Sequence, residues 1–144
     1  MCAIKQYSHA CIASLRLSGH NFKMKKILIA DDSVSVRYVI RTFLKDVPDI
    51  EICGEAANGL EAVLKAKKLE PDLVLLDLSM PMMNGAEVAS VLKKSMPHMP
   101  IILFTMYSEN VGKSLKSALG VDAVLSKPDG MTQLVATVKS TLDV

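Results

Sequence analysis

Residues 73–77 read Leu-Val-Leu-Leu-Asp, four consecutive aliphatic residues that end in a carboxylate. A short and wholly apolar run of this length is typical of a central parallel strand whose two faces are both buried. Pro71 and Asp72 come directly before the run, and these residue types are common where an element begins. We therefore predict a buried parallel strand over residues 73–77, with Asp77 at its carboxyl end.

Short apolar runs alternate with segments of helical periodicity on both sides of this strand. Aliphatic runs at 26–30, 101–104 and 123–125 predict three more strands, and alternating apolar residues at 50–54 predict an edge strand. Five strand–helix units in about 120 residues predict an α/β fold: a flavodoxin-like, doubly wound (βα)5 three-layer sandwich whose parallel sheet has the order 2-1-3-4-5. The apolar residues at helical spacing that we expect to face the sheet are Val36, Val39, Ile40, Phe43 and Leu44; Leu60, Ala62, Val63, Leu64 and Ala66; Val88, Val91 and Leu92; Val111, Leu115, Ala118 and Leu119; and Leu134, Val135, Val138 and Leu142.

The composition is that of one globular domain. The chain has 144 residues, of which 50% are hydrophobic and 22% are charged, and this balance excludes a disordered chain. No apolar run approaches the roughly 20 residues that are needed to cross a bilayer, so we expect no membrane segment. The three cysteines, Cys2, Cys11 and Cys53, form no disulfide or metal-binding pattern, which favours a reducing, cytoplasmic location.

Residues 1–23 differ from the rest of the chain in charge and in pattern. They carry Lys5, Arg16 and Lys23 and no acid, which gives a net charge of +3, and they show no period of 2 or 3.6. Residues 24–144 have a net charge of −1, which gives no sign of a nucleic-acid surface. We predict that the domain spans residues 24–144. Residues 1–23 are then a non-essential extension or the product of a mis-assigned start, with a short amphipathic tether as the alternative.

Polar side chains follow four of the predicted strands at the point where each strand ends. These residues are Asp31, Asp32, Asp77, Thr105 and Lys127. The carboxyl ends of parallel strands meet at one edge of the sheet, so we expect the three carboxylates, the hydroxyl and the ammonium to converge. Close carboxylates repel one another unless a cation lies among them, and Mg²⁺ prefers such oxygen ligands. Because a lysine ammonium suits a phosphoryl oxygen, the pattern predicts phosphoryl transfer onto one of the carboxylates.

Four motifs at these strand ends resemble the receiver domain of two-component response regulators, the CheY-like family. They are ILIADDS at 27–33, LVLLDLSMPMMNG at 73–85, ILFT at 102–105 and LSKP at 125–128. The resemblance implies that Asp77 accepts a phosphoryl group from a sensor histidine kinase or a histidine phosphotransfer protein. It also implies a site for Mg²⁺, or for Mn²⁺ in its place. Asp32 and Asp77 would bind the ion directly, Asp31 largely through water, and Ser79 through its backbone carbonyl.

The resemblance also assigns roles to the residues that follow the fourth and fifth strands. Lys127 would pair with the phosphoryl oxygens, aimed by a cis bond to Pro128, and Thr105 would be a switch hydroxyl that moves toward the phosphate. Two positions depart from the family pattern: Val124 stands where many receivers carry Tyr or Phe, and Tyr107 stands where a small or acidic residue is common. We therefore expect the loop after Thr105 to report activation. We also expect Tyr107 to slow hydrolysis of the phosphoaspartate by hindering water.

The function that the resemblance implies is a phosphorylation-dependent signalling switch that acts by binding other proteins. The domain would catalyse its own phosphorylation and dephosphorylation but would not be an enzyme with a diffusible product. We expect an output protein that the sequence does not identify, no direct nucleic-acid binding by this domain, and a monomer or a phosphorylation-dependent dimer. The end of the chain two residues after Leu142 favours a stand-alone regulator over the receiver part of a longer DNA-binding or enzymatic regulator.

Two other protein classes fit the strand-end pattern less well. An aspartyl-phosphate hydrolase also uses a strand-end aspartate and Mg²⁺, but it would need a second acid two residues later, where this chain has Ser79. A flavodoxin would need a Ser/Thr/Gly-rich phosphate loop after the first strand, whereas Asp31 and Asp32 would repel a phosphate without a metal. Arg37 and Arg41 lie on the helix that follows, and we expect them to form a solvated face.

The difference between residues 1–23 and the rest of the chain leads to the first testable prediction. Deletion of these residues should leave phosphorylation unchanged and should lower the free energy of unfolding by less than about 2 kcal/mol, because larger losses come from packed elements. Urea denaturation of the full and shortened chains measures the difference. A larger loss would show that this segment packs on the domain.

Overall fold

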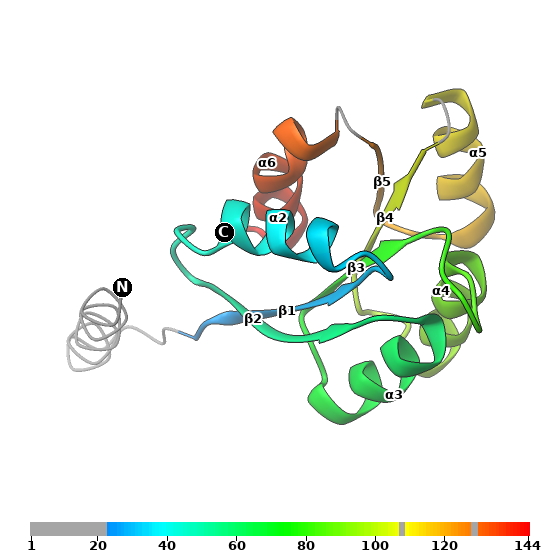
Figure 1. Ribbon diagram of the computed structural model, residues 1–144, viewed down its shortest axis with the longest axis horizontal. Coiled ribbons are helices and arrows are strands. Elements are labelled where there is room, and N and C mark those ends of the chain that lie inside the picture. Colours follow the sequence, from blue (N-terminus) through cyan, green and yellow to red (C-terminus); the bar gives the residue numbers. More distant parts are fainter. Residues whose placement is uncertain (1–22, 107–108, 128–129) are drawn as a thin grey trace.

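The structure, a computed structural model, describes residues 23–106, 109–127 and 130–144 (Figure 1). Five strands occur in this part of the chain: β1 (Lys25–Ala30), β2 (Ile50–Ala56), β3 (Leu73–Asp77), β4 (Ile101–Thr105) and β5 (Ala123–Ser126). Each is followed by a helix: α2 (Val34–Leu44), α3 (Gly59–Leu69), α4 (Gly85–Ser95), α5 (Glu109–Leu119) and α6 (Gly130–Leu142). Within these residues, no helix is both long enough and apolar enough to cross a membrane.

The strands form one parallel sheet in the order β2-β1-β3-β4-β5, which confirms the predicted order and the edge position of β2. Every residue of β3 and β4 is buried, as expected of central strands that are covered on both faces. The register aligns the carboxyl ends of neighbouring strands. Ala30 lies opposite Leu76, and Asp77 lies opposite Phe104. Residues that follow β1, β3 and β4 are therefore brought to the same edge of the sheet.

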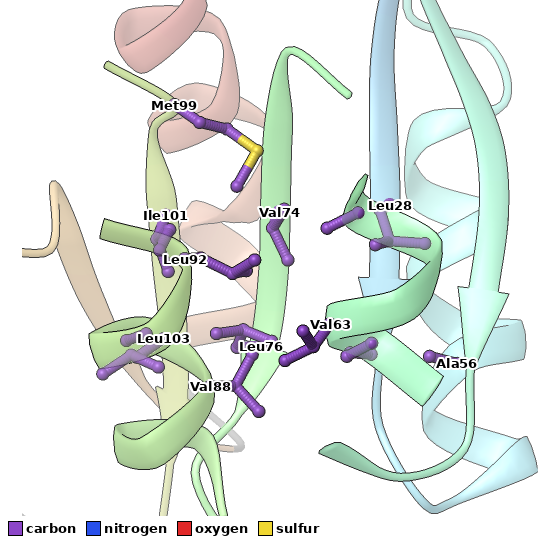
Figure 2. Packing of buried hydrophobic residues seen from close by; sticks show 14 of the residues in the cluster. Leu28, Ala56, Val63, Val74, Leu76, Val88, Leu92, Met99, Ile101 and Leu103 are labelled. Carbon is purple, nitrogen blue, oxygen red and sulfur yellow. The ribbon is translucent and has the colours of Figure 1, made fainter. Parts of the chain in front are cut away.

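Helices cover both faces of the sheet, with α3, α4 and α5 on one face and α2 and α6 on the other (Figure 1). On the first face, Leu76 of β3 lies beside Val88 and Leu92 of α4, and Leu28 of β1 belongs to the same core on the side of α3 (Figure 2). Ile29, the neighbour of Leu28, belongs to the core on the opposite face. This alternation follows from the strand period of two, and it allows one short strand to serve both cores.

The buried face of α3 differs from the one that the sequence predicts. Leu60 and Leu64 are 43% and 61% exposed, although both were expected to face the sheet. The stripe that packs on the sheet contains mostly small residues, which allow the helix to approach the strands closely. Its buried members are Gly59, Ala62, Val63 and Ala66.

Two other helices also expose residues that were expected to be buried. In α2, Ile40 and Leu44 are buried, whereas Val39 and Phe43 are 38% and 44% exposed. In α5, Val111 and Ala118 are exposed as well. The apolar stripe in these sequences is wider than the face that each helix presents to the sheet, so the residues at the border of the stripe remain in contact with solvent.

Candidate functional site

The polar residues at the strand ends lie together at the carboxyl edge of the sheet, as predicted. Asp31 directly follows β1, Asp77 and Thr105 are the last residues of β3 and β4, and Lys127 directly follows β5. Among the residues that the structure describes, the buried polar or charged ones are Asp31, Asp77 and Thr105, with 2%, 7% and 1% of their surface exposed. The fold thus gathers these buried polar groups at one edge.

Asp31, Asp32 and Asp77 form a cluster of carboxylates. Each offers one carboxylate oxygen, and the three oxygens lie within 4.8 Å of one another. Asp32 is exposed, whereas the other two are buried, so the cluster is open to water on one side. Mg²⁺ favours carboxylate oxygens and retains part of its water shell, so these residues fit the predicted ion. Which of the three carboxylates would hold the ion directly and which through water stays a prediction.

Lys127 joins two of these carboxylates. Its Nζ lies 2.9 Å from Oδ2 of Asp31 and 3.3 Å from Oδ1 of Asp77, and its backbone N–H donates to the carbonyl of Thr105 at 2.8 Å. Burial alone would lower the pKa of Lys127, but the hydrogen bond and negative charge of Asp31, and then those of Asp77, outweigh burial and raise it. The amine is therefore held as an ammonium.

The carboxyl group of Asp77 has a raised pKa. Burial is the main cause, the negative charge of Asp31 adds to it, and the ammonium of Lys127 opposes both. A carboxylate at this position is therefore less stabilised by water than an exposed one, and the ammonium of Lys127 offsets part of that loss.

The loop after β1 is fixed by hydrogen bonds at both ends. The backbone N–H of Asp31 donates to the carbonyl of Ala56 on β2 at 3.0 Å, and its Oδ1 accepts from the N–H of Ser33 at 2.8 Å. Ser33 is the N-cap of α2, where its hydroxyl accepts from the N–H of Val36. These bonds connect the buried aspartate directly to the first turn of the helix.

The loop between β3 and α4 packs closely on Asp77. The N–H of Ser79 donates to Oδ1 of Asp77 at 3.3 Å, and the N–H of Gly85 donates to the carbonyl of Leu78 at 2.8 Å. A Cβ atom at Gly85 would lie 2.5 Å from the carbonyl oxygen of Asp77, so this turn requires glycine. The role of the Ser79 carbonyl as a metal ligand stays a prediction.

Val124 is half-buried in β5, and it packs against α5 where that helix carries Gly112. A Cβ atom at Gly112 would lie 3.2 Å from Cγ1 of Val124, which shows how closely the helix approaches the strand. Tyr107 and Pro128 lie outside the described residues. The expected shielding by Tyr107 and the cis bond before Pro128 therefore stay predictions.

The expectation that Arg37 and Arg41 form a solvated face is wrong for Arg37, whereas the side chain of Arg41 is still 43% exposed. Nε of Arg37 lies 3.0 Å from Oε1 of Glu55, its Nη1 donates to the backbone carbonyl of Asp31, and Nη1 of Arg41 pairs with Oε2 of Glu55. The side chain of Arg37 is only 14% exposed. Burial would raise the pKa of Glu55, but its hydrogen bonds to the two arginines lower it. Two arginines one helical turn apart, with a glutamate on the adjacent strand, were the signal for this network in the sequence.

The close contact at Gly85 leads to a prediction. Gly85→Ala should lower the free energy of unfolding by about 1–3 kcal/mol, because the added methyl meets backbone atoms that cannot rotate away. It should also shift the amide resonances of Leu78 and Ser79. Gly120→Ala is a control, since Gly120 has a φ of +68° but open space around it, so its substitution strains the chain away from Asp77. Unchanged Leu78 and Ser79 resonances in Gly85→Ala would contradict the proposed contact.

Comparison with known proteins agrees with this geometry. The VraR response regulator protein of Staphylococcus epidermidis is 36% identical over 120 residues, which cover 82% of this chain and 56% of the relative. The chain therefore spans a little over half the length of the curated relatives that it matches.

The solved structures that resemble this chain are response regulators as well. The response regulator domain of Thermotoga maritima CheB has a TM-score of 0.77 at 26% identity, covering 85% of this chain and 98% of that one. A LuxR-family DNA-binding response regulator from Staphylococcus aureus has a TM-score of 0.75 at 27% identity, covering 83% and 99%. The family described as the response regulator receiver domain matches residues 27–139. With most of its length matched and its strands in the predicted order, the chain belongs to the response regulator receiver domain family.

Proposed function

We propose that this receiver domain is a phosphorylation-dependent switch in which Asp77 accepts a phosphoryl group from a histidine kinase or a histidine phosphotransfer protein. One observation carries the proposal: the buried carboxylate of Asp77 lies 3.3 Å from the ammonium of Lys127 and within 4.8 Å of two further carboxylates. This arrangement places a nucleophilic oxygen among groups that can balance the charge of a phosphoryl group.

In the proposed reaction, a carboxylate oxygen of Asp77 attacks the phosphorus atom of a phosphohistidine. The new P–O bond forms as the P–N bond breaks, and the electron pair of the broken bond returns to the imidazole of the donor protein. Mg²⁺, when bound by Asp32, Asp77 and the Ser79 carbonyl, with Asp31 acting through water, supplies positive charge to the phosphoryl oxygens. The acidic groups hold that charge at the edge of the sheet.

Lys127 and Thr105 act on the product side of this reaction. The ammonium of Lys127 already contacts Oδ1 of Asp77, so it is placed to pair with an oxygen of a phosphoryl group on that residue. Thr105 is buried at the end of β4, and its hydroxyl is the proposed switch group. Because the backbone N–H of Lys127 donates a hydrogen bond to the carbonyl of Thr105, a displacement of one residue would also move the other.

The output of the switch is proposed to lie in the loop that follows β4. Val124 has no ring that can turn inward behind Thr105, and its β-branched side chain has few χ1 choices. The close approach of α5 at Gly112 leaves this side chain little room to move. We therefore place the conformational response in the loop after Thr105, with Tyr107 also slowing loss of the phosphoryl group. The domain makes no diffusible product in this account and acts through protein contacts in the cytoplasm, as a monomer or as a phosphorylation-dependent dimer.

A second candidate is a receiver domain that belongs to a longer DNA-binding regulator. The similar structure from Staphylococcus aureus is described as a DNA-binding response regulator, and the chain covers 56% of its VraR relative. In this form the receiver domain would control a separate DNA-binding part and would not itself contact DNA. This reading competes with that of a stand-alone regulator.

Substitution of the phosphoacceptor tests the main proposal. Incubation with acetyl phosphate and Mg²⁺ should add one phosphoryl group to the parent, and none to Asp77→Asn, because an amide oxygen is a poor nucleophile. Mass mapping of the modified peptide identifies the site. Asp72→Asn is the matched control, since Asp72 accepts a backbone hydrogen bond from Lys26 away from the cluster. Undiminished labelling of Asp77→Asn would refute the assignment.

The metal site is tested by thermal unfolding without any phosphoryl donor. Mg²⁺ at 100 times its Kd should stabilise the parent by about 2.7 kcal/mol, because a ligand that binds only the folded state shifts the equilibrium toward it. This stabilisation should appear as a higher melting temperature. In Asp32→Ala, Mg²⁺ should raise the melting temperature much less. The same upward shift in both proteins would mean that Mg²⁺ binds elsewhere.

A further inference from the structure

We propose that Arg37 is a positioning residue for the acidic pair, and that Glu55 acts on the site only by holding Arg37. The inference rests on the proposed function, because it assigns the residue that orients the metal-binding carboxylates. It concerns a network outside the strand-end cluster, formed by α2 and β2 (Figure 1).

The contacts of Asp31 show why its main chain needs a further partner. Its N–H is bonded to Ala56, its Oδ1 accepts from Ser33, and its Oδ2 accepts from Lys127. The carbonyl oxygen is the remaining polar atom, and it accepts from Nη1 of Arg37. With this bond in place, every polar atom of the buried residue has a partner, as burial requires.

The bond to the carbonyl acts on Asp32 through the shared peptide group. The carbonyl of Asp31 and the N–H of Asp32 lie in one rigid plane, so fixing the oxygen fixes the orientation of that plane. The direction of the exposed Asp32 side chain depends on this orientation, since its carboxylate has no buried surroundings to hold it. Arg37 therefore sets the direction of a carboxylate that it does not touch.

The guanidinium suits this role because two of its nitrogens act in one plane. Nε is bonded to Oε1 of Glu55 at 3.0 Å while Nη1 is bonded to the Asp31 carbonyl. Glu55 is anchored in β2, and its other oxygen is held by Arg41. A planar fork with both ends occupied cannot rotate freely, which distinguishes arginine from lysine at this position.

The electrostatic effect of Arg37 on a bound cation has the opposite sign to its positioning effect. As a nearby positive charge, Arg37 would weaken Mg²⁺ binding, so its removal would strengthen binding if charge alone mattered. As a positioning residue, it favours binding, so its removal should weaken binding. The direction of the change therefore separates the two roles.

The test measures the affinity of the full chain for Mg²⁺ by isothermal titration calorimetry, well below the melting temperature of each variant. Arg37→Ala should weaken binding by about tenfold, the lower end of what loss of a ligand-orienting partner costs. Arg41→Ala is the matched control, because Arg41 pairs with the same Glu55 while the polar atoms of Asp31 bond to other residues. In this variant the affinity should stay within about twofold of the parent. Glu55→Ala combined with Arg37→Ala should bind no more weakly than Arg37→Ala alone.

Unchanged or tighter binding in Arg37→Ala, or equal weakening in Arg41→Ala, would overturn the inference. If Arg37→Ala does not fold, the Mg²⁺ affinities of Arg37→Lys and Arg41→Lys are compared instead. Both variants keep the positive charge, but only Arg37→Lys removes the guanidinium that bridges Glu55 and the Asp31 carbonyl, so only it should bind more weakly.

A second measurement decides the inference even if the parent binds no Mg²⁺, an outcome that would instead refute the proposed metal site. In the metal-free protein, the amide resonances of Asp32 and Ser33 should move in Arg37→Ala and stay in place in Arg41→Ala. Unmoved Asp32 and Ser33 resonances in Arg37→Ala would overturn the positioning role, whether or not the protein binds Mg²⁺.

Discussion

The carboxylates of Asp77 and Asp31 are buried close together, and the neighbouring polar groups are arranged to compensate their charge. Two like charges removed from water are costly unless cations and hydrogen bonds compensate them. Lys127 supplies a cation to both, and backbone N–H groups from Ser33 and Ser79 each donate to one of them. Each of these donors comes from a different segment, so the site is stable only when the sheet is assembled.

The parallel sheet makes this arrangement possible with short motifs. Because the register keeps the ends of β1, β3 and β4 level, one residue beyond each apolar run is enough to reach the common edge. Helices on both faces exclude water from the strands, whereas the carboxyl edge is open to solvent at Asp32. The reactive groups thus sit where a rigid, apolar interior meets solvent, and the loops that carry them are short.

The fold and the centre of the site were predictable because they depend on order along the chain. Apolar runs, their spacing and the residue that follows each run determine which side chains meet at the edge of a parallel sheet. The Arg37–Glu55 network was not predicted, since the direction of a long charged side chain depends on how α2 is rotated against β2. The same limit applies to α3, where small residues pack on the sheet and Leu64 remains exposed.

Lys127 serves two carboxylates with a single amine, and this makes Asp31 and Asp77 competitors for one cation. A change of charge at either one redistributes the ammonium between them. A neutral side chain at position 77 would release the lysine to Asp31, so such a variant differs from the parent at two residues although only one is substituted. A more negative group at position 77 would draw the lysine away and leave the buried Asp31 carboxylate short of positive charge. A change of charge at Asp77 on β3 therefore alters the electrostatic surroundings of Asp31 after β1, and the flexible side chain of Lys127 is enough to couple the two.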